Sequence, residues 1–530
     1  MRFGFVRLPE ICGQSAASAV LSHSLPPNID TLHATSERVV STQVARALVE
    51  RLFGRLDGRT ASFAATRALL ERFFPGRYAV IGPGADLAPR RTARGGGPPE
   101  IFFSAEEERG ALRLFLRALR KLPLDLGWTA TVWNRDPTAV PPQLSRRMRE
   151  RVRFAKPADG SEAQHLARSE IFVATSTGSA PAPGLLLRAI AGGAVPVASR
   201  LPQYEEALRE GELGLLFEPR DTVTLTAQLE RLLTDSELVE GFTRRVDEAR
   251  AGLDWSHTAE AFEALYEEVA ARRHAGDGSP GARQRLAARG FIPVDLHMHT
   301  DHSHDCATPV STLLEAAAAA GLGAIAVTDH NEVSGAHEAR AQAGEDGPVK
   351  VIVGEEVKTA DQGEVIGLFI EQRIPRGMTL RETIAAIRAQ GGLVYVPHPF
   401  DRIHSVPDYE HLLEVVEEVD ALEVFNPRVA FSAFNEEAER FAAKYRIVAG
   451  AGSDSHVAAG LGSVKIRMRD FDGPEEFLES LRDADIVRKP KSLLDVQALK
   501  FIQTKATPQT ARRRTARPGR GAVRAGEGKE

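Results

Sequence analysis

The sequence predicts an α/β protein built as two successive α/β halves, and three observations support this. Short apolar runs alternate with amphipathic segments through both halves of the 530 residues, as strands alternate with helices. A stretch without apolar rhythm, 273–290, separates the halves. In the rear half, apolar runs repeatedly end in histidine or carboxylate residues, which indicates a site assembled at strand ends.

The front half contains apolar runs that predict strands and amphipathic runs that predict helices. The expected strands are 101–105 (IFFSA), 129–133 (TATVW), 170–176 (EIFVATS) and 194–199 (AVPVAS). The expected helices are 109–122 and 224–235. Alternation of this kind favours a parallel sheet.

Two segments differ in composition from the rest. Residues 273–290 are rich in Gly, Arg and Ala and predict a linker. Residues 505–530 are basic and almost free of apolar side chains, so we expect a disordered tail. A basic tail could contact nucleic acid or acidic lipid, although a solvated end is the favoured interpretation.

The overall composition is that of an ordinary globular protein. With 43% hydrophobic and 26% charged residues and a net charge of −5, nothing global indicates nucleic-acid or membrane binding. Cys12 and Cys306 are the two cysteines and stand far apart, which favours a reducing compartment over a disulfide scaffold. No apolar run approaches the roughly 18 residues of a membrane span. The start, MRFGFVRLPE, lacks the apolar core of a signal peptide, so we expect a cytoplasmic protein.

The rear half opens with its most informative stretch, VDLHMHTDHSHDC at 294–306. Side chains two apart in a strand point the same way. His297 and His299 are therefore expected on one face, and Leu296 and Met298 on the other. Such a two-faced strand suits a barrel that packs helices outside and holds a metal inside.

Four further apolar runs end in the same kind of residue. The runs 324–328, 349–353, 393–397 and 446–452 are followed by these residues: Asp329 and His330, Glu355 and Glu356, His398, and Asp454 and His456. Strand termini converge at the carboxyl end of an α/β barrel, where active sites lie. Five strand ends with this pattern predict one shared site.

These motifs resemble those of the PHP (polymerase and histidinol phosphatase) metal-dependent phosphoesterases. The similarity covers about 291–490, within a predicted domain at 291–500, through DLHMHT at 295–300, TDH at 328–330, GEE at 354–356, PHP at 397–399 and SDSH at 453–456. The resemblance implies a distorted (β/α)7 barrel with two or three divalent metal ions. The implied metal ligands are His297, His299, Asp305, His330, Glu356, His398, Asp454 and His456. Those with an implied catalytic role are His297, His299, His398 and Asp454.

Some of these positions admit alternatives. His304 rivals Asp305, whereas Glu356 fits the family's Gly-x-Glu spacing better than Glu355. Where many members carry a histidine, this chain has Glu364, which puts a filled third metal site in question. Imidazole and carboxylate ligands suit Mn, Zn or Fe, and the sequence does not choose among them. Asp295 is expected to orient a ligating imidazole.

Substrate contacts are expected just past the ligands. Arg402 could clamp a phosphate oxygen, or equally be a surface arginine paired to a loop carboxylate. His404 is a candidate acid at the rim. Asn426, with nearby Arg428, follows another apolar run and is a further candidate for substrate binding.

Residues 170–220 resemble the nucleotide-sugar-binding domain of GT-B glycosyltransferases, through GLLLRAIAGGAVPVAS (184–199) and GELGLLFEPRD (211–221). The resemblance implies a Rossmann-like domain at 98–272, preceded by a remnant of the other lobe at 1–97. The family's two glutamates fall on Ala180 and Arg188. Its phosphate-holding loop falls on SAEEERG (104–110), where Arg109 and Gly110 remain but three glutamates would repel a diphosphate.

The sequence thus predicts metal-dependent hydrolysis of phosphate esters. The expected substrate is a small phosphorylated metabolite, a nucleotide or a short oligonucleotide, with no membrane partner. The alternatives are a nonenzymatic sensor or scaffold, and a glycosyltransferase with an accessory PHP domain.

Overall fold

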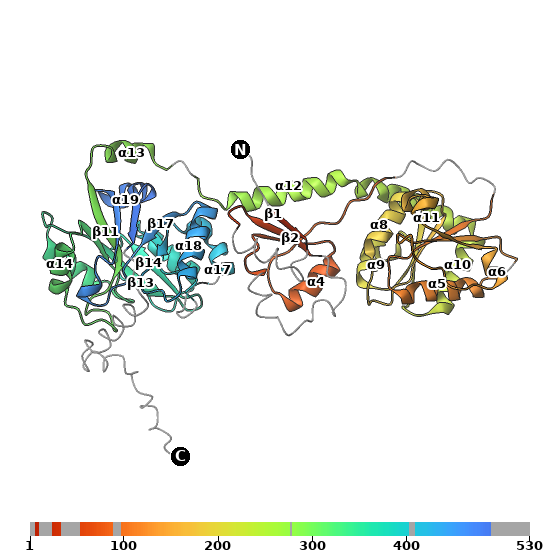
Figure 1. Ribbon diagram of the computed structural model, residues 1–530, viewed down its shortest axis with the longest axis horizontal. Coiled ribbons are helices and arrows are strands. Elements are labelled where there is room, and N and C mark those ends of the chain that lie inside the picture. Colours follow the sequence, from red (N-terminus) through yellow and green to blue (C-terminus); the bar gives the residue numbers. More distant parts are fainter. Residues whose placement is uncertain are drawn as a thin grey trace, which may run out of the picture. The chain divides into compact units, whose positions relative to one another are not determined.

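The structure is a computed structural model that describes residues 6–9, 24–32, 53–87, 97–123, 125–275, 278–401, 407 and 409–488 (Figure 1). The expected tail at 505–530 lies outside these residues. The chain divides into two compact units: Met1–Leu21 with Pro27–Val269, and Ser22–Pro26 with Ala270–Glu530. No helix in the described ranges combines the length and the apolar character that crossing a bilayer requires.

The first unit contains a six-stranded parallel sheet with strand order β10-β9-β8-β5-β6-β7. Its strands are β5 (Glu100–Ser104), β6 (Thr129–Trp133), β7 (Val152–Ala155), β8 (Ile171–Ala174), β9 (Val195–Ser199) and β10 (Leu215–Phe217). The four strands expected from the sequence are confirmed as β5, β6, β8 and β9. They are apolar on both faces because helices cover both sides of the sheet.

Helices of this unit alternate with the strands. They are α5 (Arg109–Lys121), α6 (Arg146–Arg149), α7 (Glu162–Leu166), α8 (Pro183–Gly192), α9 (Pro202–Ala207), α10 (Thr222–Thr234) and α11 (Ser236–Arg250), with 3-10 turns η3 (Pro157–Asp159), η4 (Arg209–Gly211) and η5 (Ala251–Leu253). The expected helices are confirmed as α5 and α10. Helix α5 buries Leu114, Phe115 and Leu119 and packs against α10.

A smaller parallel sheet, β1-β2-β3-β4, belongs to the same unit. Its elements are β1 (Val6–Pro9), β2 (Asn28–Leu32), β3 (Gly58–Ala61), α4 (Ala64–Phe73) and β4 (Ala79–Val80). Helix α12 (Trp255–Ala271) buries Phe262 and Val269 in an apolar cluster with Ile29 of β2.

The segment expected to be a linker contains a helix, α13 (Pro280–Leu286). Arg283 and Arg285 of α13 pair with Glu479 and Glu476 of α19 (Gly473–Arg482), at 2.7 and 2.6 Å. The helix is thus held by tertiary ion pairs, which explains why its local sequence shows little apolar rhythm.

The second unit is built on a nine-stranded sheet in the order β17-β16-β15-β14-β13-β12-β11-β18-β19, counted over its described residues. The strands are β11 (Phe291–Met298), β12 (Ala324–Val327), β13 (Lys350–Lys358), β14 (Glu364–Leu368), β15 (Leu393–Val396), β16 (Ala421–Phe425), β17 (Val448–Ala451), β18 (Val464–Arg469) and β19 (Asp485–Arg488). The sheet nearly closes on itself, because the segment after β17 bonds to the end of β11. Asp454 N–H donates to His297 O at 2.8 Å and His299 N–H donates to Ser455 O at 3.0 Å.

This sheet differs from the expected (β/α)7 barrel in three strands. β14 returns antiparallel to β13 through a short turn, β18 pairs antiparallel with β11, and β19 pairs antiparallel with β18. The other connections carry helices α14 (Val310–Ala319), α15 (Ser334–Ala343), α16 (Leu380–Ala389), α17 (Tyr409–Glu414) and α18 (Ser432–Tyr445), with 3-10 turns η6 (Val416–Glu418) and η7 (Ala458–Gly460). Helices and strands share a large apolar core outside the sheet, and a second core fills its interior.

Candidate metal centre

Strand β11 delivers the first two imidazoles. His297 and His299 are fully buried and their ring centroids lie 5.2 Å apart. Leu296 and Met298 are both buried but lie in different apolar cores, so the single shared face that the alternation predicts is not found. The reason is an irregularity in the pairing of β11 with β12 between Asp295 and Met298. Asp295, one pleat earlier, accepts Ser453 N–H at 2.9 Å and so ties β11 to the segment that carries Asp454. Burial raises the pKa of Asp295 to about 6.

Glu356 of β13 lies at the centre of the remaining side chains. One of its oxygens is 3.2 Å from His297 Nε2, 3.2 Å from His330 Nδ1 and 3.4 Å from His299 Nε2. The other oxygen is 3.3 Å from His398 Nε2. A single carboxylate therefore contacts imidazoles from three strand ends.

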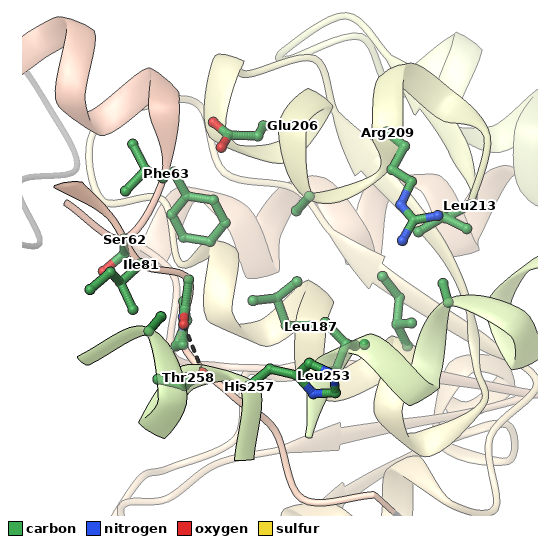
Figure 2. Close-up of a pocket in the computed structure, with 18 residues that line it drawn as sticks. Ser62, Phe63, Ile81, Leu187, Glu206, Arg209, Leu213, Leu253, His257 and Thr258 are labelled. Atoms are coloured by element: carbon green, nitrogen blue, oxygen red, sulfur yellow. Dashed lines mark hydrogen bonds between the residues drawn. The ribbon is translucent and has the colours of Figure 1, made fainter. Parts of the chain in front are cut away.

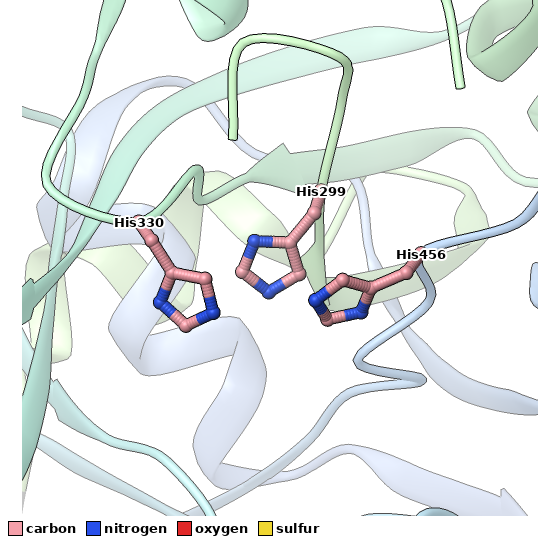
Figure 3. Close-up of side chains that lie close together, drawn as sticks. All are labelled: His299, His330 and His456. Carbon is pink, nitrogen blue, oxygen red and sulfur yellow. The ribbon is translucent and has the colours of Figure 1, made fainter. Parts of the chain in front are cut away.

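A second carboxylate, Asp454, lies on the other side of the two β11 histidines. Its Oδ1 is 3.5 Å from His299 Nε2 and 3.4 Å from His456 Nδ1. Figure 3 shows the rings of His299, His330 and His456 close together, each from a different strand end.

The structure brings these side chains into four overlapping groups whose donor atoms lie within 4.8 Å of one another. The groups are His299, His330 and His456; His297, His299 and Asp454; His297, Glu356 and His398; and His330, Glu356 and Glu364. His299 Nδ1 is buried and has no hydrogen-bond partner among the described residues. Nitrogen and carboxylate donors in this mixture fit Mn, Fe or Zn, and the shared members allow neighbouring ions.

Of the two rivals after β11, Asp305 contacts the cluster more directly. Its Oδ2 is 3.1 Å from His456 Nε2 and 3.5 Å from His330 Nε2. His304 is exposed, and its ring centroid is 5.3 Å from that of His330. Burial acts to raise the pKa of Asp305, but the bonds to His330 and His456 outweigh it and lower the value below its ordinary range.

The neighbouring carboxylates and imidazoles set different protonation states in one cluster. Burial and the nearby His456 and His330 lower the pKa of His299 to about 3, so its ring is neutral at pH 7. Burial also acts to lower the pKa of His330 and His398, but Glu356 helps to raise both values to about 9. Cation binding would therefore release protons from His330 and His398.

The backbone is held in unusual conformations where the ligands project. His398, Asp454 and Asn331, the residue after His330, have φ of 26°, 49° and 53°. Left-handed backbone costs a non-glycine residue on the order of 1–2 kcal/mol. The surrounding contacts offset this, and the strain marks the strand ends as a functional region.

Glu423 is a buried carboxylate that the sequence analysis did not identify. It is 0% exposed; Oε1 accepts from His297 Nδ1 at 3.1 Å, and Oε2 accepts from His398 N–H at 2.7 Å and Asn426 Nδ2 at 3.0 Å. Such carboxylates fix the tautomer and orientation of metal-binding imidazoles. The sequence carried a signal for it, because a carboxylate inside the apolar strand ALEVF needs a hydrogen-bonding or charged partner if it is buried.

Gly452 permits this arrangement. A Cβ at that position would lie 2.2 Å from His297 Cβ and 2.6 Å from Glu423 Oε1. The strand-end sequence AGSDSH therefore needs glycine before Ser453 so that β17 can approach β11.

The predicted substrate residues have different outcomes. Arg402 and His404 lie outside the described residues. Asn426 is fully buried and bonds to Glu423 and Asp454 instead of projecting into open space. Arg428 donates to the backbone and side-chain oxygens of Asp454, both at 2.8 Å, and remains partly exposed, so it places a positive charge at this site.

Glu355, the neighbour of Glu356 in β13, faces away from the metal-binding cluster. It is buried, accepts Ile374 N–H at 2.7 Å, and has its pKa raised to about 7 by burial. Glu364 is the first residue of β14 and belongs to one donor group with His330 and Glu356. This chain therefore offers a carboxylate where many family members carry a histidine.

Sequence comparisons agree with this site. The profile of the PHP domain matches residues 295–482. An uncharacterised protein of Methanocaldococcus jannaschii is 33% identical over 215 residues, which cover 38% of this chain and 85% of that protein. The chain belongs to the PHP domain family. A second uncharacterised protein of the same organism is 35% identical over 145 residues, covering 26% of this chain and 82% of the relative.

The part of the chain before the PHP domain matches another family. The profile described as glycosyl transferases group 1 covers residues 98–235. A phosphatidyl-myo-inositol mannosyltransferase of Mycobacterium leprae is 31% identical over 122 residues, 23% of this chain and 33% of that enzyme. Among solved structures, Anabaena HepE in complex with UDP aligns with a TM-score of 0.41 and 17% identity, covering 48% of this chain and 75% of that one.

In the first unit, the crevice where ligands bind open α/β sheets is filled by the chain's own side chains. The strand order reverses between β5 and β8, so the crevice lies at their carboxyl ends. There Glu107 accepts Thr175 N–H at 2.8 Å and the Tyr204 hydroxyl, and Glu108 accepts Ser176 Oγ at 2.7 Å and Thr177 N–H. Burial raises the pKa of Glu107 to about 7.

Arg188 and Ala180 stand where the resemblance places the family's two glutamates. Arg188 pairs with Glu162 at 2.8 Å and with Glu106 at 2.9 Å. The glutamates expected to repel a diphosphate thus also form bonds across the crevice.

Proposed function

We propose that the PHP domain hydrolyses phosphate esters with the help of two or three divalent metal ions. The observation that supports this most directly is the set of four overlapping donor groups at converging strand ends, beside the partly exposed Arg428. Bound metal ions would supply charge neutralisation for the phosphate and a water of lowered pKa. We propose Mn, Zn or Fe as the metal.

The chain's own residues would bind and orient the ester. Arg428 Nη1 lies 2.8 Å from Asp454 Oδ1, at the edge of the donor groups, where the guanidinium can also donate a hydrogen bond to a phosphoryl oxygen. Glu423 keeps the His297 Nδ1 proton directed away from the site, so that Nε2 faces inward. Arg402 and His404 remain proposed contacts at the rim.

We propose small phosphorylated metabolites, nucleotides or short oligonucleotides as substrates, in a cytoplasmic setting. The test is hydrolysis of p-nitrophenyl phosphate, AMP and a short RNA by protein loaded with Mn²⁺. We expect turnover of at least one, and loss of both turnover and bound metal in His297→Ala/His299→Ala. His337→Ala is the matched control, because His337 on α15 bonds to the Glu371 carbonyl and lies outside the donor groups. Metal-loaded protein that cleaves none of the three would favour the scaffold alternative.

We further propose that the group 1 glycosyltransferase region does not transfer sugar. Glu107 and Glu108 already bond the N–H groups that an anionic ligand would need, and the pair of family glutamates is absent. Calorimetry with UDP-glucose tests this, and a measured heat of saturable binding would restore the transferase alternative.

A further inference from the structure

The first unit contains a cavity of about 360 Å³ that is distinct from both the metal centre and the filled crevice. It lies where the residues after β3 and β4 meet α8, α9 and the start of α12 (Figure 2). Ala64 N–H and Ala65 N–H at the start of α4 donate to Glu206 of α9, at 2.7 and 2.9 Å, and so join the two walls. Its size is that of a small-molecule site.

The interior of the cavity is apolar. Phe63 and Ile81 line one side, Leu187 lies between, and Leu253 and Leu213 complete the lining (Figure 2). An aromatic or branched aliphatic group of a ligand would displace water from this lining, and burying its apolar surface would favour binding.

Two charged side chains line the cavity, Glu206 and Arg209. The two oxygens of the Glu206 carboxylate each accept an N–H group of α4, so both face the start of that helix. Arg209 makes no ion pair with any described carboxylate, and Figure 2 shows its guanidinium reaching toward Leu213 at the lining. His257 adds a second nitrogen-bearing group at the opposite edge.

The backbone that carries Arg209 is strained. Arg209 and Glu210 have φ of 48° and 55°, two successive non-glycine residues in the left-handed region. Each costs on the order of 1–2 kcal/mol, and strain of this kind gathers at ligand clamps. The turn η4 thus keeps a cationic side chain at an apolar cavity at a cost to folding.

From the apolar lining, the absence of an ion pair at Arg209 among the described carboxylates, and the bonding of Glu206 to α4, we propose that this cavity binds a small anionic amphiphile. Its ligand has an apolar body and one acidic group, a carboxylate, sulfonate or phosphate. The acidic group pairs with Arg209, and the body packs on Phe63 and Leu187. This site is independent of the phosphoesterase proposal, because it uses no residue of the PHP domain.

The test uses two fluorescent probes of similar shape on the full-length protein. 8-Anilino-1-naphthalenesulfonate carries one negative charge, and N-phenyl-1-naphthylamine carries none. We expect saturable binding of both, with the charged probe held more tightly. Arg209→Gln should weaken the sulfonate about tenfold, the scale of a bond to a charged group, and leave the neutral probe unchanged.

Two further variants keep the outcome decisive. Ala261 lines the cavity at an exposed position, so Ala261→Trp should fill the cavity without disturbing the packing of the apolar core. Saturable binding of both probes should then be lost. Arg117→Gln, an exposed arginine on α5 away from the cavity, should change neither affinity. Unchanged sulfonate affinity in Arg209→Gln, or unchanged binding of both probes in Ala261→Trp, would overturn the proposal.

Discussion

Replacing Glu423 by glutamine is expected to remove His297 from the metal centre although the side chains have nearly the same shape. Glu423 accepts three hydrogen bonds, one on Oε1 from His297 Nδ1 and two on Oε2 from His398 N–H and Asn426 Nδ2. A glutamine has one accepting oxygen and one donating amide group. Whichever way it turns, the amide group meets a donor.

The less costly orientation places the glutamine oxygen toward His398 and Asn426 and its amide group toward His297. His297 Nδ1 must then accept, which moves the ring proton to Nε2. A protonated Nε2 cannot bind a metal, and Nε2 is the atom that faces Glu356 at 3.2 Å. Outer carboxylates of this kind typically change metal affinity 10- to 100-fold. Because a whole ligand is withdrawn, we expect the upper end, about 100-fold or about 2.7 kcal/mol.

The assay is titration of metal-free protein with Mn²⁺ by calorimetry, together with elemental analysis of the purified protein. Glu417→Gln is the matched control, because Glu417 is an exposed glutamate on η6 of the same unit. Circular dichroism establishes that each variant is folded. An affinity for Mn²⁺ within twofold of the wild type in Glu423→Gln would refute the tautomer argument.

Two other predictions concern the metal centre, and a third concerns Glu107 of the first unit. Glu364→His should raise the ratio of Zn to Mn in protein purified without added metal, because imidazole replaces a harder carboxylate donor; an unchanged ratio would count against a role for this position. Mn²⁺ affinity should rise between pH 6.5 and 8.5, because His330 and His398, with pKa values of about 9, must lose protons to bind; calorimetry at both pH values should also detect proton release, and a flat profile would contradict this. Glu107 has its pKa raised from 4.5 to about 7 by burial, so the folded protein binds the extra proton and stability falls as pH rises through that window, by up to about 3 kcal/mol. Glu107→Gln should flatten this fall in urea unfolding at pH 5 and pH 8, and an equally steep fall would show that other groups cause it.

The sequence predicted the donors of the metal centre because their positions follow two simple rules. Alternation along β11 placed His297 and His299 together, and apolar runs that end in His330, His398 and Asp454 converge at the carboxyl ends of strands. Each rule acts locally, so a single sequence is enough to apply it.

What the sequence did not predict depends on partners far along the chain. Glu423 gains its meaning from His297, and α13 is held by glutamates of α19. The antiparallel strand β14 departs from the barrel pattern because a short turn at 359–363 replaces a helix. In the first unit, the charge of Glu107 and Glu108 predicted repulsion of a ligand, but the backbone N–H groups that bind them carry no mark in the sequence.

The pairing of β11 with β18 has a consequence for biosynthesis. β11 emerges from the ribosome long before its antiparallel neighbour, in which Arg469 pairs with Phe291 and Ile466 pairs with Val294. Until then the strand bearing the first two imidazoles has one bare edge, open to pairing with other nascent chains. If translation stops before Val464, β18 is never made and that edge of β11 stays unpaired. We therefore expect such a truncated product to aggregate.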